Sequence, residues 1–103
     1  MLPPEILDNA ALHRFELHVH GETAVLLYER TGELLRLIHT EVPQSLEGKG
    51  VGSKLVSAVL RFAQENRLSV VPLCPFVAQY MKRHPEYSSI VDPPHRWMIG
   101  SAQ

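Results

Sequence analysis

Three glycines at alternate positions, Gly48, Gly50 and Gly52, lead directly into an amphipathic segment in the stretch EGKGVGSKL. The N-terminus of a helix presents unpaired backbone N–H groups and a partial positive charge, so a glycine-rich turn at that point can cradle phosphate oxygens. The same glycines could instead do no more than shape a turn between a strand and a helix. The stretch therefore has two interpretations, a phosphate-binding loop or a plain connection.

The spacing of this loop excludes two common phosphate-binding motifs. A P-loop requires Gly-Lys-Ser or Gly-Lys-Thr, whereas Lys49 is followed by Gly50. The dinucleotide-binding fingerprint requires Gly-x-Gly-x-x-Gly, which the stretch from Gly48 to Gly52 does not supply. A pyrophosphate held by another type of loop remains a candidate ligand.

The one cysteine of the chain, Cys74, stands directly before Pro75. Proline suits the first turn of a helix, and a sulfur at a helix N-terminus is biased toward the reactive thiolate form. The alternative is a buried, inert cysteine. A single cysteine excludes an intrachain disulfide and a cysteine-based zinc site.

Two further reactive side chains, His39 and Glu41, lie two residues apart in a segment expected to be a strand, so they share one of its faces. Either could accept a proton from an amine, and histidine is the better suited to neutral pH. The alternative is a polar pair on a half-exposed strand. His18 and His20 also share a strand face, but no third ligand is indicated, so we expect no metal site.

The composition is that of an ordinary globular domain. Of the 103 residues 45% are hydrophobic, which is enough for one modest core, so we expect a single domain over residues 1–103. Ten Lys and Arg residues against eleven Asp and Glu residues give a formal net charge of -1, which disfavours nucleic acid and membrane surfaces as partners. No signal peptide or membrane-spanning stretch is evident, so we expect a soluble, cytoplasmic protein.

Three strands should precede the glycine loop. Residues 15–20 alternate apolar and polar side chains, the pattern of a strand with one buried face. Residues 23–30 and 34–42 are rich in leucine, β-branched and aromatic side chains and are bounded by turn sequences around Gly21 and Gly32. Strands joined by such short turns form an antiparallel meander.

Beyond Pro43 the pattern predicts two helices around another strand. Residues 51–66 gather apolar side chains on one helical face, residues 68–73 suit a buried strand parallel to the third one, and residues 75–84 suit a second helix. We expect apolar residues between 90 and 99, including Trp97, to close the core as an irregular segment or a last short strand. The order defines an α+β, or mixed α/β, fold.

Two longer stretches carry a family resemblance. HTEVPQSLEGKGVGSKLV and VVPLCPFVAQYMKRHPEY resemble the GNAT N-acetyltransferase superfamily, and in particular its small, single-domain YjdJ-type acetyl-CoA-binding members, over roughly residues 12–90. The loop resembles the acetyl-CoA pyrophosphate loop, in which Arg or Gln is followed by two residues, Gly, one residue, and Gly or Ala. Gly50 and Gly52 occupy the glycine positions, and Glu47 stands where the family has Arg or Gln.

The resemblance implies a minimal GNAT-like fold with acetyl-CoA, or CoA, in a gap between the third strand and the strand at residues 68–73. It implies cofactor contacts from Glu41, Val42, Glu47, Gly48, Lys49, Gly50, Val51, Gly52 and Ser53. Lys49 and Lys54 are close enough in sequence to add positive charge. The resemblance also implies catalytic roles for Cys74, for His39 and for Tyr80, which falls where many GNAT proteins carry a tyrosine that protonates the CoA thiolate. Tyr80 could instead be a core aromatic.

The hypothesis is an N-acetyltransferase that moves an acetyl group from acetyl-CoA to a primary amine of a small molecule or polypeptide. Direct attack by the amine and an acetyl-cysteine intermediate are both open. The chain lacks the pair of helices that larger GNAT proteins insert between their first two strands, a region that helps form the acceptor site. The alternative is a non-catalytic acetyl-CoA-binding sensor or interaction module, and the oligomeric state is open.

Overall fold

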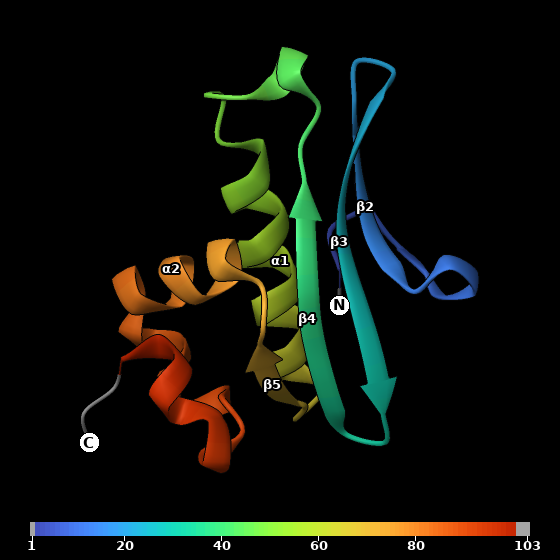
Figure 1. The fold of residues 1–103 in the computed structure, drawn as a ribbon. Coiled ribbons are helices and arrows are strands. Elements are labelled where there is room, and N and C mark those ends of the chain that lie inside the picture. The colour runs from blue at the N-terminus through green and yellow to red at the C-terminus, as the bar shows by residue number, and fades with distance from the viewer. Residues whose placement is uncertain (1, 101–103) are drawn as a thin grey trace.

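A computed structural model of the protein describes residues 2–100, and Figure 1 shows a sheet with helices packed beside it. The strands are β1 (Ile6–Asn9), β2 (Arg14–Val19), β3 (Glu22–Thr31), β4 (Leu34–Glu41) and β5 (Ser69–Pro72), and the helices are α1 (Val51–Glu65) and α2 (Pro75–Arg83). The first four strands are antiparallel neighbours in chain order, and β5 lies parallel to β4. The predicted α+β fold of meander, helix, parallel strand and helix is confirmed.

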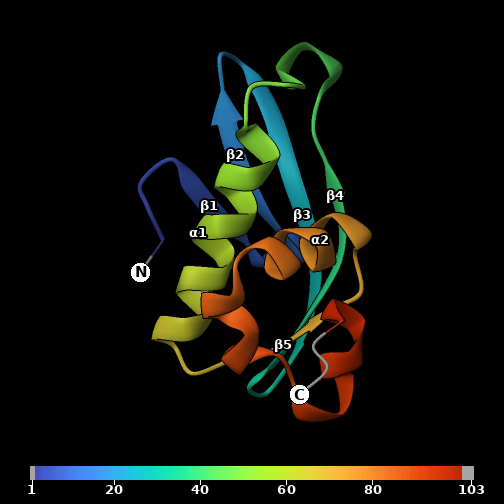
Figure 2. The same ribbon diagram turned by 90° about the vertical axis from the view of Figure 1, so that its left-hand side faces the viewer.

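Both helices pack on the same face of the sheet, which is the face seen in Figure 2. Helix α1 buries the apolar face that its periodicity predicts, with Val51, Gly52, Leu55, Val56, Ala58, Val59, Leu60 and Ala63 all buried. Burying one Leu or Val side chain contributes about 1.5–3 kcal/mol. Within residues 2–100, no helix covers the opposite face of the sheet, and neither helix has the length and apolar character to span a bilayer.

Strand β1 is missing from the sequence-based expectation. Its four residues follow two prolines and show no clear alternation, so a propensity argument reads them as a leader. The strand pairs with β2 from Ile6 opposite Leu17 to Asn9 opposite Arg14. The connection is short because the Asn9 side chain accepts a hydrogen bond from the Leu12 N–H at 3.2 Å.

Glu16 departs from the expected alternation of β2. The period-two pattern places it on the exposed face, yet its residue exposure is only 4%. Its carboxylate accepts hydrogen bonds from Arg14 Nε at 2.7 Å and Asn9 Nδ2 at 3.0 Å, and His18 Nε2 lies 3.1 Å from the other oxygen. The hydrogen bond from Arg14, followed by that from Asn9, lowers the pKa of Glu16 from 4.5. Asn9 belongs to β1, which the sequence did not predict. This strand therefore contributes to the burial of Glu16, which the sequence did not predict either.

Strands β4 and β5 run together for four residue pairs and then diverge. The last pair is Leu37 with Pro72. The Cys74 N–H donates to the Leu37 carbonyl at 2.9 Å, after which Pro75 starts α2 and leads the chain away. Strand β4 continues to Glu41, so its last four residues have no strand beside them on this edge in the described chain.

A β-bulge in β4 lies at the point of divergence. Leu27 pairs with His39 and Tyr28 with Leu37, so Ile38 is an extra residue. The extra residue reverses the alternation of side chains beyond it. Leu37 is in the core, Ile38 and His39 are exposed, and Thr40 points back toward the helices, where it contacts Cys74.

The C-terminal segment closes the core differently from the expectation. Two 3-10 helices, Pro85–Ile90 and Pro93–Ile99, replace a last strand, and Val91 makes a single parallel bridge to Val70. Val91 and Ile99 are buried as expected, but the expectation for Trp97 is wrong because its side chain is 70% exposed.

The buried carboxylate generates a prediction for stability against pH. Because the pKa of Glu16 is lower in the folded protein than its ordinary value of 4.5, ionised Glu16 favours folding above that pH and the contribution is lost as the pH falls through the folded-state pKa. The free energy of unfolding should therefore fall more steeply with acidification in the wild type than in Glu16→Gln. Denaturant melts from about pH 6 to pH 3 measure this difference. Glu29→Gln, at an exposed position of β3, is the control, and parallel curves for wild type and Glu16→Gln would contradict the prediction.

Candidate functional site

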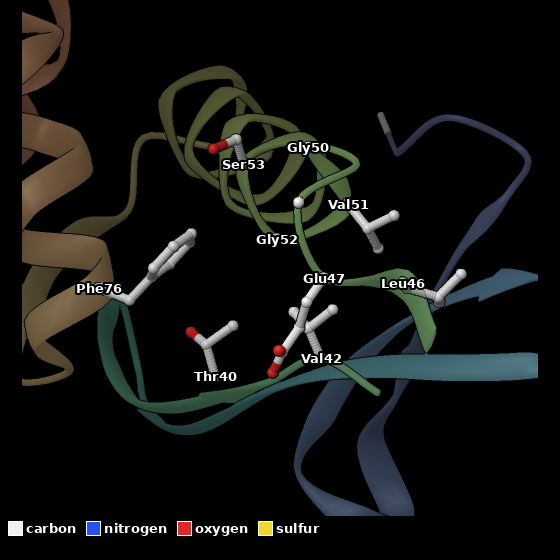
Figure 3. A pocket seen from close by; sticks show the side chains of 10 residues that line it. Thr40, Val42, Leu46, Glu47, Gly50, Val51, Gly52, Ser53 and Phe76 are labelled. Atoms are coloured by element: carbon white, nitrogen blue, oxygen red, sulfur yellow. The ribbon is translucent and has the colours of Figure 1, made fainter. Parts of the chain in front are cut away.

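A pocket of about 380 Å³ opens between the end of β4, the glycine loop and the starts of both helices (Figure 3). It is lined by Thr40, Val42, Leu46, Glu47, Gly48, Gly50, Val51, Gly52, Ser53 and Phe76. Seven of the nine residues predicted to contact a cofactor are among them. The other two, Glu41 and Lys49, are exposed and do not line the pocket.

The three glycines of the loop serve two different purposes. Gly48 and Gly50 have φ angles of 79° and 75°, a left-handed conformation that favours glycine. Gly52 is helical, but a Cβ there would lie 3.0 Å from Phe76 Cζ and 3.3 Å from Val42 Cγ2. The first two glycines therefore make the turn, whereas Gly52 lets Phe76 and Val42 approach the helix and so shapes the pocket.

The first turn of α1 offers hydrogen-bond donors to the pocket. Gly50 is the N-cap residue and has no side chain that could bond to the helix, and the first turn contains no acidic residue. The first hydrogen bond of the helix runs from the Lys54 N–H to the Gly50 carbonyl at 3.0 Å. The N–H groups of Val51, Gly52 and Ser53 therefore have no acceptor within the helix. Together with the helix dipole they favour the binding of an anion.

The charged side chains around this turn are arranged less simply than the sequence suggests. Lys54, expected to add positive charge, forms an ion pair with Glu5 at 3.0 Å. Glu47 lines the pocket, and Figure 3 shows its side chain extending from the loop toward β4. A carboxylate there would oppose a bound anion.

Three pocket residues, Thr40, Leu46 and Phe76, are absent from the sequence-based prediction. Thr40 stands two positions before Val42 on β4, so the period of two that places one side chain in the pocket places the other there as well. Phe76 is the second residue of α2 and remains 40% exposed over Gly52. The alternation around Val42 could have revealed Thr40, whereas Phe76 depends on the tertiary approach of two helices.

Cys74 lies behind Thr40. It is the N-cap residue of α2, as the sequence predicts, but it is only 3% exposed and does not line the pocket. Its Sγ lies 3.3 Å from the Thr40 Oγ1. The sulfur is therefore connected to the pocket through the threonine hydroxyl.

His39 and Glu41 share a face of β4, as predicted, and their Nε2 and Oε2 atoms lie 3.1 Å apart. Both side chains are exposed, at 53% and 69%. Because successive strand residues alternate, this face is opposite to the one that carries Thr40. The end of β4 thus presents the histidine on the open side of the sheet and the threonine on the pocket side.

Tyr80 lies one helical turn beyond Phe76 and is part of the hydrophobic core cluster. Its ring stacks on His84 at a centroid distance of 4.0 Å and lies 6.4 Å from the ring of Tyr87. It is not among the residues that line the pocket, so its role as an acid remains a prediction from the resemblance.

The mixed sheet with its diverging strands, the glycine loop and the two α-helices on one face make up a minimal GNAT-like fold. The family model described as GCN5-related N-acetyl-transferase matches residues 14–90, which run from β2 to the end of the 3-10 helix Pro85–Ile90. The chain therefore belongs to the GCN5-related N-acetyltransferase family.

Among its relatives are the proteins called Protein NATD1. The chain is 36% identical to the mouse protein over 86 residues, covering 81% of this chain and 78% of the relative. The human protein is also 36% identical over 86 residues, with coverage of 81% and 76%. The chicken protein is 33% identical over 86 residues, with coverage of 81% and 78%.

The arrangement of Thr40 in front of Cys74 generates a prediction for thiol chemistry. Iodoacetamide should alkylate native Cys74 slowly, because the sulfur is buried and its contact with the pocket is occupied by the Thr40 hydroxyl. Thr40→Ala should raise the alkylation rate by about tenfold, since a local opening is then no longer needed. Mass spectrometry of the native protein measures the rate. Thr31→Ala, an exposed threonine at the end of β3, is the control, and equal rates in wild type and Thr40→Ala would contradict the arrangement.

Proposed function

We propose that the protein is an acetyl-CoA-dependent N-acetyltransferase whose acceptor is a primary amine of a small molecule or polypeptide. The observation that carries this proposal is the pocket in which free amides at the start of α1 face the unpaired edge of β4. We place the reaction in the cytoplasm, a reducing compartment that suits a chain with one free cysteine.

The two ends of the pocket suit two parts of acetyl-CoA. The N–H groups of Val51, Gly52 and Ser53 would donate to the diphosphate, and Phe76 would cover the chain that follows it. Beyond Leu37 the backbone of β4 has no strand beside it on one edge within residues 2–100, and this edge would bond to the amides of the pantetheine arm. Acetyl-CoA supplies an activated thioester, and the protein holds that thioester at the gap between β4 and β5.

The open face of the sheet gives the amine its access. His39 lies on this face, and its Nε2–H can donate to Glu41, which leaves Nδ1 to accept a proton from the attacking amine. Glu41 would then stabilise the positive charge on the imidazole. The amine and the thioester would thus approach β4 from opposite faces and meet at the gap.

The geometry supports direct attack by the amine over an acetyl-cysteine intermediate. Cys74 is 3% exposed and stands behind Thr40, so its sulfur has no open line to a thioester in the pocket. Direct attack requires only that the base, the amine and the thioester be aligned.

One observation favours a second function, a binding module without efficient chemistry. Glu47 places a carboxylate beside the expected diphosphate, which would weaken cofactor binding. Detection of an acetylated product separates the two functions, because a binding module would respond to CoA and yield none.

Cofactor binding is tested by thermal melting with CoA. Ligand at 100 times its dissociation constant should stabilise the wild type by about 2.7 kcal/mol. In Gly52→Ala the new methyl group would contact Phe76 and Val42 and push into the pocket. The apo protein should melt within a few degrees of the wild type, because alanine favours the helix and the exposed Phe76 can move, whereas CoA affinity should fall about tenfold or more. Ala78→Gly, in α2 away from the pocket, controls for effects of helix propensity. The absence of any CoA-induced shift in the wild type would overturn the proposed function.

Transfer is tested with isotopically labelled acetyl-CoA and a panel of amines, read by mass spectrometry. The wild type should yield acetylated amine without stable label on Cys74. His39→Gln should lower kcat about 100-fold, because the group that accepts the amine proton is lost. His20→Gln, in the turn before β3, is the control histidine. A His39→Gln variant with unchanged kcat would exclude His39 as the base, and label on Cys74 during turnover would contradict direct attack.

A further inference from the structure

We propose that Thr40 is a catalytic residue of this reaction and that Cys74 is its positioning residue. The Thr40 hydroxyl donates a hydrogen bond to the sulfur of CoA as it leaves, and the Cys74 thiol fixes the direction of that hydroxyl. The inference rests on the proposed transferase function and adds a group that stabilises the leaving thiolate.

The first observation is the place of Thr40 on β4. The bulge at Ile38 turns Thr40 toward the helices, and its side chain lines the pocket (Figure 3). This position is within the four residues of β4 that have lost β5 as a neighbour. A thioester held along this edge, with its diphosphate at the start of α1, therefore ends beside Thr40.

The second observation is the contact between Thr40 Oγ1 and Cys74 Sγ at 3.3 Å. Cys74 is held firmly, because its N–H donates to the Leu37 carbonyl at 2.9 Å and its carbonyl accepts from the Ala78 N–H at 3.0 Å. Within residues 2–100, the side chain that forms a hydrogen bond with this sulfur is that of Thr40. The thiol is therefore a fixed group with a single polar neighbour.

Either atom could donate in this contact, and the proposal takes the Cys74 thiol as the donor. A hydroxyl has one proton and two acceptor lone pairs, and a thiol has one proton. When the Cys74 S–H donates to Thr40 Oγ1, the threonine proton is free to point into the pocket. In this arrangement the buried Cys74 thiol acts by orienting the Thr40 hydroxyl. The Cys74 sulfur therefore does not need to reach the cavity.

The proton balance of the step is complete without a further group. The amine nitrogen forms a bond to the thioester carbon, and its proton passes to His39 on the opposite face of β4. The bond between carbon and sulfur then breaks with both electrons on sulfur, where the Thr40 hydrogen bond stabilises the negative charge. CoA takes up a proton from water on release, and protonated His39 returns its proton to water.

The test compares two substitutions of similar size. Thr40→Val keeps the shape of the side chain and removes the hydroxyl, whereas Thr40→Ser keeps the hydroxyl. We expect Thr40→Val to lower kcat about 100-fold with KM for acetyl-CoA and the CoA-induced melting shift changed by less than about twofold. Thr40→Ser should retain kcat within about fivefold, and Cys74→Ala should lower kcat by less than Thr40→Val does, because the hydroxyl remains but is no longer fixed.

The results that would overturn the inference differ from those that would overturn the transferase function. An unchanged kcat in Thr40→Val, or an equal loss in Thr40→Val and Thr40→Ser when both melt like the wild type, would overturn the inference alone. A wild type that binds CoA but acetylates no amine would overturn the transferase function and with it the role of Thr40.

Discussion

The divergence of β4 and β5 beyond Leu37 is the constraint on which the rest of the site depends. Pro75 contributes to it, because it starts α2 three residues after the last pair between the two strands and leads the chain away from β4. The contact between the Cys74 N–H and the Leu37 carbonyl is the backbone hydrogen bond at which the two segments separate. Past that contact β4 has one edge without a strand partner in the described chain, and the N-terminus of α1 lies across the resulting pocket. An extended ligand could bind both segments. Its amide groups would hydrogen-bond to the edge of β4, and its anionic end would accept hydrogen bonds from the N–H groups at the start of α1.

The same strand also separates two kinds of chemistry. The bulge at Ile38 leaves His39 and Glu41 on the open face of the sheet and turns Thr40 toward the pocket and Cys74. A base on one face and a hydrogen-bond donor on the other suit a reaction in which the two substrates arrive from opposite sides. Within residues 2–100 no α-helix covers the open face, which leaves room there for an amine (Figure 2).

Local patterns predicted the elements well, and tertiary contacts account for what they missed. The periodicity of α1, the turn glycines and Pro75 each reflect a local preference, so the meander, both helices and β5 could be derived from the sequence. The burial of Glu16 could not, because it depends on Asn9 from a neighbouring strand that lacks a pattern of its own. Most of the cofactor-contact prediction came from a resemblance and coincides with the pocket, whereas Phe76 required knowledge of how the two helices approach each other.

Hydrogen–deuterium exchange with and without CoA tests the central claim that the cofactor lies between β4 and the start of α1. The account predicts slower exchange of the backbone amides in residues 38–42 and 50–53 when CoA is bound, with little change in β1 at the far edge of the sheet. Slower exchange in only one of the two segments would mean that CoA does not contact the other segment as proposed. Unchanged exchange in both segments at a CoA concentration that raises the melting temperature would contradict the account.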